Sequence, residues 1–240
     1  MINEESMKKT LVILTLNEID GLKVLFDRIP LNSADEVVCI DGGSQDGTVE
    51  FLTGRGVPVL SQEAPGRGSA CRTALSRCNG DVLLFFSPDG NEDPQDIPIL
   101  FERIAQGYDM VIASRFLPGG RNEEDGGLIR PRSWVNRAFS YMANFLWNTG
   151  DPVTDTINGF RALRREAMIR LNSDESGFAL EYQITIRAMK LHMRIGEIPT
   201  VESPRIGGAV KARSFPVGWR HILIFLQEII NGYSFERSLP

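Results

Sequence analysis

The chain has 240 residues, 42% of them hydrophobic, which suffices for one large domain or for a domain with an appendage. Its formal net charge of −5 argues against indiscriminate nucleic-acid binding. Residues 1–10 lack the apolar region of a signal peptide, and no run approaches the roughly 20 apolar residues that span a bilayer.

The first half of the chain alternates short apolar runs with helical patterns. The runs are typical of strands buried on both faces and cover residues 10–16, 36–40, 57–60, 81–86 and 109–113. Apolar residues at helical spacing lie between them, as at Ile97, Leu100 and Ile104. This regular alternation predicts an α/β fold with a parallel, doubly wound sheet and right-handed crossovers.

The second half predicts a less regular arrangement. We expect loops at 116–127 and 205–211, helices at 134–146, 165–171, 177–191 and 219–230, and strands at 159–163 and 195–201. On the last helix, Trp219, Ile222 and Leu226 share one apolar stripe, with Ile224 outside it. This stripe and the aromatic-rich residues 134–147 predict either core packing or contact with a bilayer surface.

The stretch 80–94, GDVLLFFSPDGNEDP, combines a buried strand with an acidic loop. The strand ends before Pro88, because proline cannot donate to a β-ladder. The side chains of Asp89, Asn91 and Glu92 follow at once, and oxygen ligands at the carboxyl end of a strand suit a hard divalent cation. The alternative is a solvated turn before the next helix, with Asp93 as its cap.

Several short motifs stand in one order along the chain: LTLNE at 14–18, CIDGGS at 39–44, DGT at 46–48, GRGSA at 66–70 and SPD at 87–89. Together they resemble the nucleotide half of family 2 glycosyltransferases. The motifs SR at 114–115, GFRAL at 159–163 and RIGGAVK at 205–211 are more narrowly similar to dolichyl-phosphate mannose synthase and its polyprenyl-phosphate relatives.

The resemblance implies a GT-A fold, with a mostly parallel sheet flanked by helices and a C-terminal extension on the acceptor side. It divides the chain into a catalytic domain over 1–212 and an amphipathic helix with a tail over 213–240. Within the domain, about 8–115 would bind a nucleotide diphosphate sugar and about 116–212 the acceptor. The family usually uses Mg²⁺ or Mn²⁺.

Donor-binding residues are expected at the strand ends. By resemblance, the nucleotide sugar contacts Leu14, Leu16, Glu18, Asp41, Arg67, Ser87, Pro88 and Asp89. Glu18 could accept from ribose hydroxyls and Asp41 from a base N–H, while Arg67 at a helix start suits a diphosphate. The structural alternatives are a first-turn helix charge for Glu18, a turn cap for Asp41 and a surface position for Arg67.

Asp89 is the predicted metal ligand, assisted by Asn91. In the family, the second aspartate of an Asp-X-Asp motif holds the cation that bridges the diphosphate, and Asp89 stands at that position. Ser87 replaces the first aspartate and offers a neutral hydroxyl in place of a charge. A metal-independent or inactive member therefore stays an alternative.

Basic residues gather on the acceptor side. By resemblance, the acceptor phosphate contacts Arg115, Arg132, Asn136, Arg205 and Lys211. The catalytic residues implied are Asp89, Arg115, Arg205 and Lys211. Family members usually carry serine where this chain has Val210, so the loop clamp is incomplete. The alternative is a set of surface arginines that pair with the acidic residues 123–125.

Cysteine and histidine offer no metal-ligand spacing. The cysteines (Cys39, Cys71 and Cys78) are expected as free thiols in a reducing compartment. The histidines (His192 and His221) are expected at the surface or at helix ends. Glu181 could act as a base toward a hydroxyl acceptor, or it could be a solvated helix carboxylate.

These residues predict an inverting glycosyltransferase that moves mannose or glucose from a GDP-mannose or UDP-glucose type donor to a polyprenyl phosphate. A phosphate monoester has a second pKa of about 6, so its oxygen is anionic at neutral pH and needs no strong base. The alternatives are a soluble or cell-wall hydroxyl acceptor, and a non-catalytic nucleotide-sugar binding protein. We expect a cytoplasmic protein, peripheral on the inner face of a membrane if the acceptor is a lipid.

Overall fold

The computed structural model describes residues 7–126, 131–207 and 214–236. Its centre is one seven-stranded sheet in the order β3-β2-β1-β4-β6-β5-β7. The strands are β1 (Lys9–Thr15), β2 (Glu36–Asp41), β3 (Val59–Ser61), β4 (Val82–Phe86), β5 (Met110–Ser114), β6 (Arg161–Arg164) and β7 (Ile195–Pro199). β6 runs antiparallel to β4 and β5, while the other neighbouring pairs are parallel. The predicted mostly parallel sheet is thus confirmed, with one reversed strand that the sequence did not predict.

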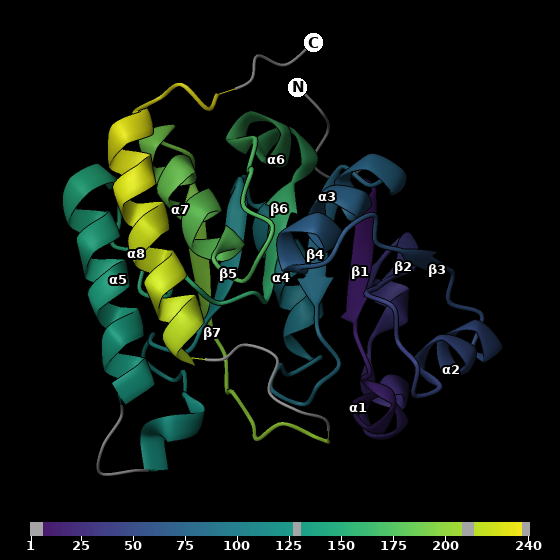
Figure 1. Ribbon diagram of the computed structural model, residues 1–240. Helices are drawn as coiled ribbons and strands as arrows, with labels where there is room; N and C mark the ends of the chain where they lie inside the picture. Colours follow the sequence, from purple (N-terminus) through teal and green to yellow (C-terminus); the bar gives the residue numbers. More distant parts are fainter. Residues whose placement is uncertain (1–6, 127–130, 208–213, 237–240) are drawn as a thin grey trace.

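Helices cover both faces of this sheet, giving three layers (Figure 1). The α-helices are α1 (Ile19–Leu25), α2 (Thr48–Gly54), α3 (Arg67–Arg77), α4 (Asp96–Ala105), α5 (Pro131–Trp147), α6 (Arg165–Leu171), α7 (Leu180–Lys190) and α8 (Ser214–Asn231). Short 3₁₀ turns are η2 (Phe26–Arg28), η3 (Leu31–Ser33) and η4 (Glu123–Gly126). Helices α1, α2 and α4 pack on one face, and α3 and α5 to α8 on the other.

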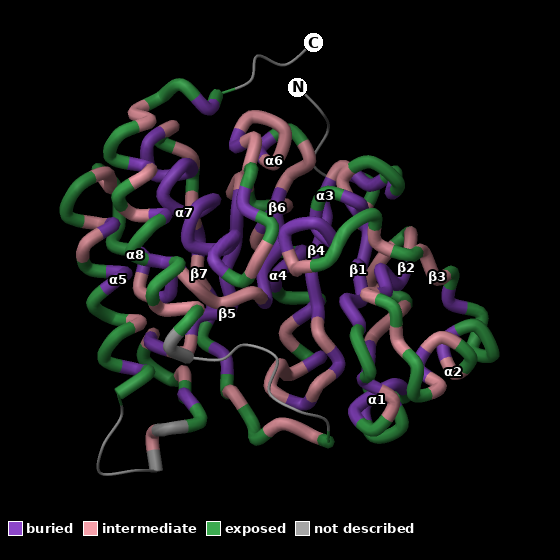
Figure 2. The backbone as a smooth tube through the Cα atoms, viewed as in Figure 1, coloured by how far each residue is buried: buried purple, intermediate pink, exposed green. Residues whose placement is uncertain are grey.

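The core follows from the two-residue period of the strands. In β4, Leu83 and Phe85 point into the cluster under α3 and α5 to α8, whereas Leu84 and Phe86 point into the cluster under α4. Both faces of β4 are therefore buried, as Figure 2 shows for the centre of the sheet. This explains why β4 reads as an unbroken apolar run rather than an alternating one.

The reversed strand matters for the site. The carboxyl ends of β1, β2, β4 and β5 share one edge of the sheet, where ligands bind in open α/β folds. Because β6 is antiparallel, its amino end lies at that same edge. The residues just before β6, including Gly159, are thereby brought beside the loop that follows β4.

Two glycines at the start of α3 allow a close backbone contact. A Cβ at Gly68 would lie 2.0 Å from the carbonyl oxygen of Glu175, and one at Gly66 would lie 2.2 Å from that of Ser176. Gly66 also has a φ of 109°, which favours glycine. The two glycines of the GRG motif therefore allow the start of α3 to contact the segment before α7. Arg67, between the glycines, lies where α3 and this segment meet.

Helix α8 packs through a polar stripe rather than through its apolar one. Glu228 is fully buried and accepts from Arg187 Nε at 2.9 Å and from Lys190 Nζ at 2.8 Å, both on α7. Ile224 and His221 are buried on the same side. The predicted stripe with Trp219 at its start is exposed instead, so its interpretation as a core-packing face is wrong. The division of the chain at residue 212 stays a prediction.

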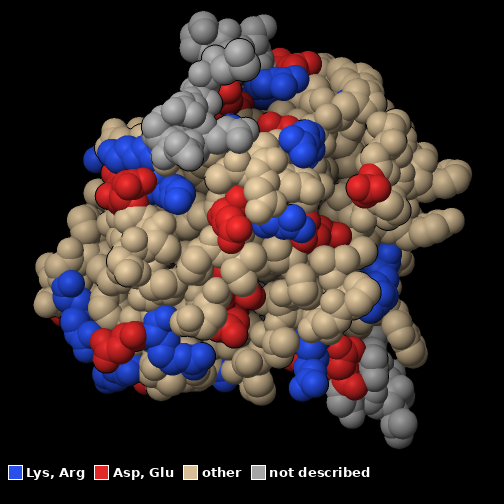
Figure 3. All heavy atoms as spheres, turned by 180° about the vertical axis from the view of Figure 1, so that it is seen from behind, with Lys and Arg blue, Asp and Glu red and all other residues tan. Residues whose placement is uncertain are grey.

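Acidic and basic side chains are intermixed on the face seen in Figure 3, so this face carries no large patch of one charge. Apolar side chains are exposed on two neighbouring helices: Trp134, Tyr141 and Phe145 on α5, and Trp219 and Ile230 on α8. Among the helices in the described ranges, none combines the length and the apolar character needed to cross a bilayer.

Candidate active site

Two cavities meet at the carboxyl edge of the sheet. The smaller, of about 450 Å³, lies at the ends of β1 and β2 and is lined by Leu14, Leu16 and Glu18 among others. The larger, of about 630 Å³, extends between α5, α7 and α8. Both are lined by Arg67, Ser87, Asp89, Asn91, Arg132, Phe178 and Glu202. Most of the predicted donor and acceptor residues therefore converge on one region, with Asp41 and Pro88 outside it.

Asp41 organises a turn rather than lining either cavity. It accepts hydrogen bonds from Thr15 Oγ1 at 2.8 Å and from the backbone N–H groups of Gly43 and Ser44, each at 2.8 Å. Burial alone would raise the pKa of Asp41, but these bonds hold the pKa below its ordinary value. This arrangement matches the turn-cap alternative. Pro88 lies outside the linings as well, since its carbonyl faces α1 at Gly21.

Arg205 lies across the smaller cavity and neutralises two carboxylates. Its Nη2 is 2.7 Å from both oxygens of Glu18, and its Nη1 is 2.5 Å from Asp89 Oδ2. The next residue anchors this segment, because Ile206 N donates to the Asp89 carbonyl at 2.7 Å. The predicted ribose and metal carboxylates are therefore adjacent, and a guanidinium cation sits between them.

The predicted metal ligands Asp89 and Asn91 both line the two cavities. The Asn91 side-chain nitrogen donates to the Ser203 carbonyl at 2.7 Å. In the described part of the chain, no group of three His, Cys, Asp or Glu residues could hold a metal alone. Mg²⁺, however, binds proteins through one or two carboxylates and completes its shell with phosphate oxygens and water. Asp89 already lies against a cation, the Arg205 guanidinium, so Asp89 and the side-chain oxygen of Asn91 would hold the metal once Arg205 moves away.

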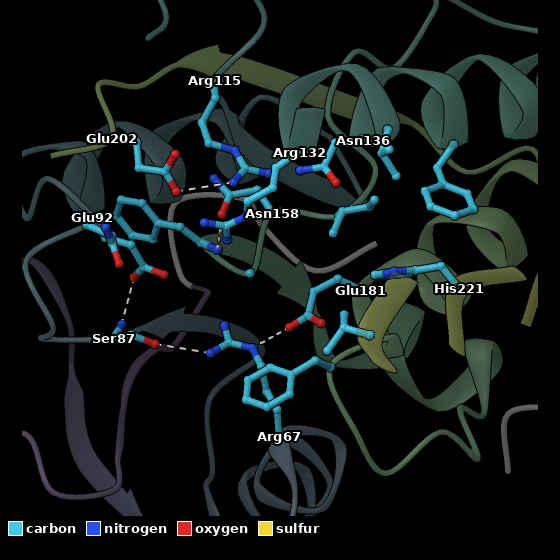
Figure 4. Close-up of a pocket in the computed structure, with 18 of the residues that line it drawn as sticks. Arg67, Ser87, Glu92, Arg115, Arg132, Asn136, Asn158, Glu181, Glu202 and His221 are labelled. Carbon is cyan, nitrogen blue, oxygen red and sulfur yellow. Dashed lines mark hydrogen bonds and ion pairs between the residues drawn. The ribbon is translucent and has the colours of Figure 1, made fainter. Parts of the chain in front are cut away.

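Arg67 joins the two cavities. Its Nε donates to Glu181 on α7, and its Nη1 donates to Ser87 Oγ at 3.1 Å (Figure 4). Burial would lower the pKa of Arg67, but the Glu181 charge raises it, so the guanidinium stays charged. A Cβ at Gly159 would lie 2.1 Å from Arg67 Nη2. A side chain at position 159 would therefore displace the Arg67 guanidinium, and the surface alternative for Arg67 is wrong.

Glu92 belongs to the predicted acidic loop but was not among the predicted site residues. It lines the larger cavity, and its Oε2 accepts from Ser87 N at 2.7 Å. Burial raises the pKa of Glu92 to about 8, against the opposing charge of Arg67. The sequence shows an acidic loop but not which of its carboxyls turns inward, because burial depends on residues far along the chain.

The Glu92→Gln variant is expected to be more stable than the wild type only at higher pH. The folded-state pKa of Glu92 exceeds the ordinary value of 4.5, so protonated Glu92 stabilises the fold, and that contribution is lost as the pH rises toward about 8. Glutamine resembles the protonated acid at every pH. The difference in Tm between variant and wild type, measured without metal, should be near zero at about pH 5 and should grow by several degrees by about pH 8. A Tm difference that stays constant with pH would contradict the raised pKa of Glu92.

The arginines of the acceptor side differ in their partners. Arg115 is buried and paired with Asp155 at 2.7 Å and with Glu202 at 3.2 Å, so its charge is already balanced. Burial would raise the pKa of Asp155, but Arg115 holds the pKa below its ordinary value. Arg132 is half exposed and paired with Glu123 at 2.5 Å, as the acidic-loop alternative predicted. Lys211 lies outside the described residues.

Two further side chains of the larger cavity differ from expectation. Glu181 is 4% exposed and ion-paired with Arg67, so the solvated-carboxylate alternative is wrong. His221 is 3% exposed and lines the cavity beside Val217 and Gly218, so its predicted surface or helix-end position is also wrong. His192 is exposed directly after α7 with a φ of 50°, and its helix-end prediction is confirmed.

Comparison with known proteins identifies the family of this chain. The family described as "Glycosyl transferase family 2" matches residues 10–171. The chain belongs to glycosyltransferase family 2. It is 32% identical to a dolichyl-phosphate hexose transferase of Haloferax volcanii over 75% of each chain. It is 30% identical to an undecaprenyl-phosphate mannosyltransferase of Micrococcus luteus, over 85% of this chain and 90% of that protein.

Other relatives are longer. The chain is 30% identical to Glycosyltransferase AglJ of Haloferax volcanii over 72% of its own length but spans only 55% of that protein. Among solved structures, glucosyl-3-phosphoglycerate synthase from Mycobacterium tuberculosis, in complex with Mn²⁺, UDP and glucosyl-3-phosphoglycerate, superposes with a TM-score of 0.70. The two share 21% identity, over 94% of this chain and 81% of that one. The predicted GT-A fold is confirmed, and the protein is a glycosyltransferase.

Proposed function

We propose that this glycosyltransferase transfers a hexose from a nucleotide diphosphate sugar to a polyprenyl phosphate, with inversion at the anomeric carbon. The observation that carries the proposal is the shared wall of the two cavities. Asp89, Ser87 and Arg67 face both the smaller cavity at the strand ends and the larger one under α5 and α8. Relatives named for dolichyl-phosphate and undecaprenyl-phosphate acceptors support the acceptor class.

The smaller cavity is the donor compartment in this proposal. Leu14 and Leu16 would flank the base, and Glu18 would face the ribose. Asp89 would hold Mg²⁺ or Mn²⁺, as the Mn²⁺ and UDP of the structural neighbour suggest. The cation would supply charge neutralisation of the leaving diphosphate. Arg205, released from Asp89 and Glu18, would turn its guanidinium to phosphate oxygens.

The larger cavity is the acceptor compartment. Arg132 and Asn136 on α5 line it and would contact the acceptor phosphate, together with Arg205 from the segment after β7. Lys211, outside the described residues, is proposed as a further contact from the sequence motif alone. Arg115 would hold this wall in place through Asp155 and Glu202. The phosphate oxygen is anionic at neutral pH, so it attacks without a base, and the protein has only to place it in line.

The acceptor class also implies a place of action. A polyprenyl phosphate is anchored in a bilayer, and the exposed apolar side chains of α5 and α8 lie on the helices that line the acceptor cavity. We therefore place the reaction at the cytoplasmic face of a membrane, with the protein bound peripherally.

Donor binding can be tested with a thermal-shift panel of UDP-glucose, GDP-mannose, UDP and GDP, each with and without Mn²⁺. A ligand at about 100 times its Kd adds roughly 2.7 kcal/mol to the free energy of unfolding. For a chain of this size that shifts Tm by roughly 2–4 °C per kcal/mol. We expect one sugar nucleotide to raise Tm, and more strongly with Mn²⁺. A flat response to every donor contradicts the proposal.

A further inference from the structure

The inner end of the larger cavity carries a histidine to which the proposed chemistry gives no role. His221 lies on α8 and is 3% exposed, with its imidazole beside Glu181 (Figure 4). Its ring packs against the rings of Phe139 and Tyr182, at centroid distances of 5.2 Å and 5.5 Å. The ring is thus fixed by its neighbours, and only its nitrogen atoms are left to interact with a ligand.

The two ring nitrogens of His221 differ in their surroundings. The backbone of Val217, one turn earlier in α8, favours a proton on the ring. Nε2 is buried and has no hydrogen-bond partner among the described residues. With the ring proton assigned to Nδ1, toward the backbone of Val217, Nε2 carries no hydrogen. Burial lowers the pKa of His221, against the raising charges of Glu181 and Glu175, so the ring is neutral at pH 7. Nε2 then presents a lone pair.

A buried acceptor without a donor is unfavourable, and native structures normally pair such groups. Packing at position 221 does not require a histidine. Ile224, on the same buried stripe of α8, fills its place with an apolar side chain. A residue such as leucine would fill the same place between Phe139 and Tyr182 at no polar cost. The retained nitrogen points to a donor that arrives with the ligand.

We propose that His221 Nε2 accepts a hydrogen bond from a hydroxyl group of the molecule that occupies the larger cavity. The assignment rests on the proposed function, because it takes this cavity as the place where hexose and acceptor meet. The lone pair would repel an anionic phosphate oxygen, so the phosphate belongs near Arg132 and a hydroxyl-bearing group near α8. The hydroxyl can come from the transferred hexose or from a hydroxyl-bearing acceptor.

Two variants separate the polar role of His221 from its packing role. His221→Leu keeps an apolar side chain of similar reach and removes the acceptor, whereas His221→Gln places an amide oxygen where Nε2 lies. Calorimetry should be run on both variants and on the wild type with UDP-glucose, GDP-mannose, UDP and GDP in the presence of Mn²⁺. The ratio of the affinities for sugar nucleotide and nucleotide diphosphate measures the hexose contact alone.

If the hexose supplies the hydroxyl, His221→Leu should lower that ratio by about three- to tenfold, the range expected for one neutral hydrogen bond, and His221→Gln should restore it. If the acceptor supplies it, the ratio should stay unchanged. In that case His221→Leu should lower kcat/KM for a hydroxyl acceptor such as 3-phosphoglycerate by a similar or larger factor. That second result would support His221 while contradicting a polyprenyl phosphate as the acceptor.

The proposal is overturned if His221→Leu leaves both the affinity ratio and the turnover at wild-type values while Tm stays equal or rises. His221 would then be a core residue whose Nε2 is met by water. A wild-type protein that binds sugar nucleotides but fails to glycosylate polyprenyl phosphate contradicts the proposed acceptor only, because the affinity ratio still tests His221. A wild-type protein that binds no sugar nucleotide contradicts both.

Discussion

Replacing Asp89 with asparagine is expected to lower the rate of hexose transfer by about 100-fold or more. The carboxylate faces both cavities and is the predicted ligand of the metal that would neutralise the leaving diphosphate. Asparagine keeps the shape but removes the charge that would hold a divalent cation, and such charge stabilisation is worth several kcal/mol in the transition state. The measurement is kcat at saturating donor, together with the affinity for Mn²⁺ in the presence of the nucleotide.

Asp93→Asn is the matched control, because it makes the same change in the same loop. Asp93 Oδ1 accepts from Gln95 N at 3.1 Å in the turn before α4, and because Gln95 is the N-cap residue of α4, the predicted cap role of Asp93 is wrong. Its side chain is 42% exposed, and its Oδ1 is 4.0 Å from Arg28 Nη2. This exposed and distant ion pair contributes little to stability. This variant should keep near-wild-type kcat. Equal activity of Asp89→Asn and Asp93→Asn would show that Asp89 does not act in transfer.

The second large effect is expected on stability. Arg67→Met should lower the free energy of unfolding by about 3–5 kcal/mol, because it leaves the buried Glu181 carboxylate without its cation. Methionine keeps much of the side-chain volume, so the loss reports the charge rather than a cavity. For a chain of this size, the drop in Tm should be roughly 2–4 °C per kcal/mol. Thermal or urea unfolding without ligand measures it.

A second substitution tests the cause of that loss. Arg67→Met combined with Glu181→Gln should recover much of the stability, because the uncompensated charge is then removed and the two sites couple. Arg77→Met, on the exposed end of the same helix, should change stability by less than about 0.5 kcal/mol. If the double variant is as unstable as the sum of the two single variants, the ion pair is not what stabilises this junction.

The strands were predictable because their periodicity is local. The apolar runs at 36–40 and 81–86 correspond to β2 and β4 within a residue or two. The direction of β6 was not predictable, since nothing in four residues of strand indicates which neighbours it will join. The side of α8 that is buried could not be predicted from the sequence for a related reason. The apolar stripe was the obvious candidate, but Arg187 and Lys190 on α7 supply partners for Glu228, and the polar stripe packs instead.

The site was predictable as a set of residues but not as a set of contacts. Asp89 and Arg67 were assigned from motifs near strand and helix ends, and both line the shared wall. Their partners come from distant parts of the chain: Arg67 meets Glu181 at a separation of 114 residues, and Arg205 meets Glu18 at 187. Such pairings depend on the tertiary fold. His221 was missed because its burial depends on how α8 packs.

The most direct test of the proposed function is to measure hexose transfer to a polyprenyl phosphate. The protein should be incubated with Mn²⁺, a polyprenyl phosphate in detergent or vesicles, and UDP-glucose or GDP-mannose, and the lipid product analysed by mass spectrometry and by NMR of the anomeric centre. We expect a hexosyl phosphate lipid with β configuration, formed from the α-linked donor. A product with retained α configuration, or sugar delivered only to a hydroxyl acceptor while the lipid phosphate stays unmodified, would contradict the proposed function.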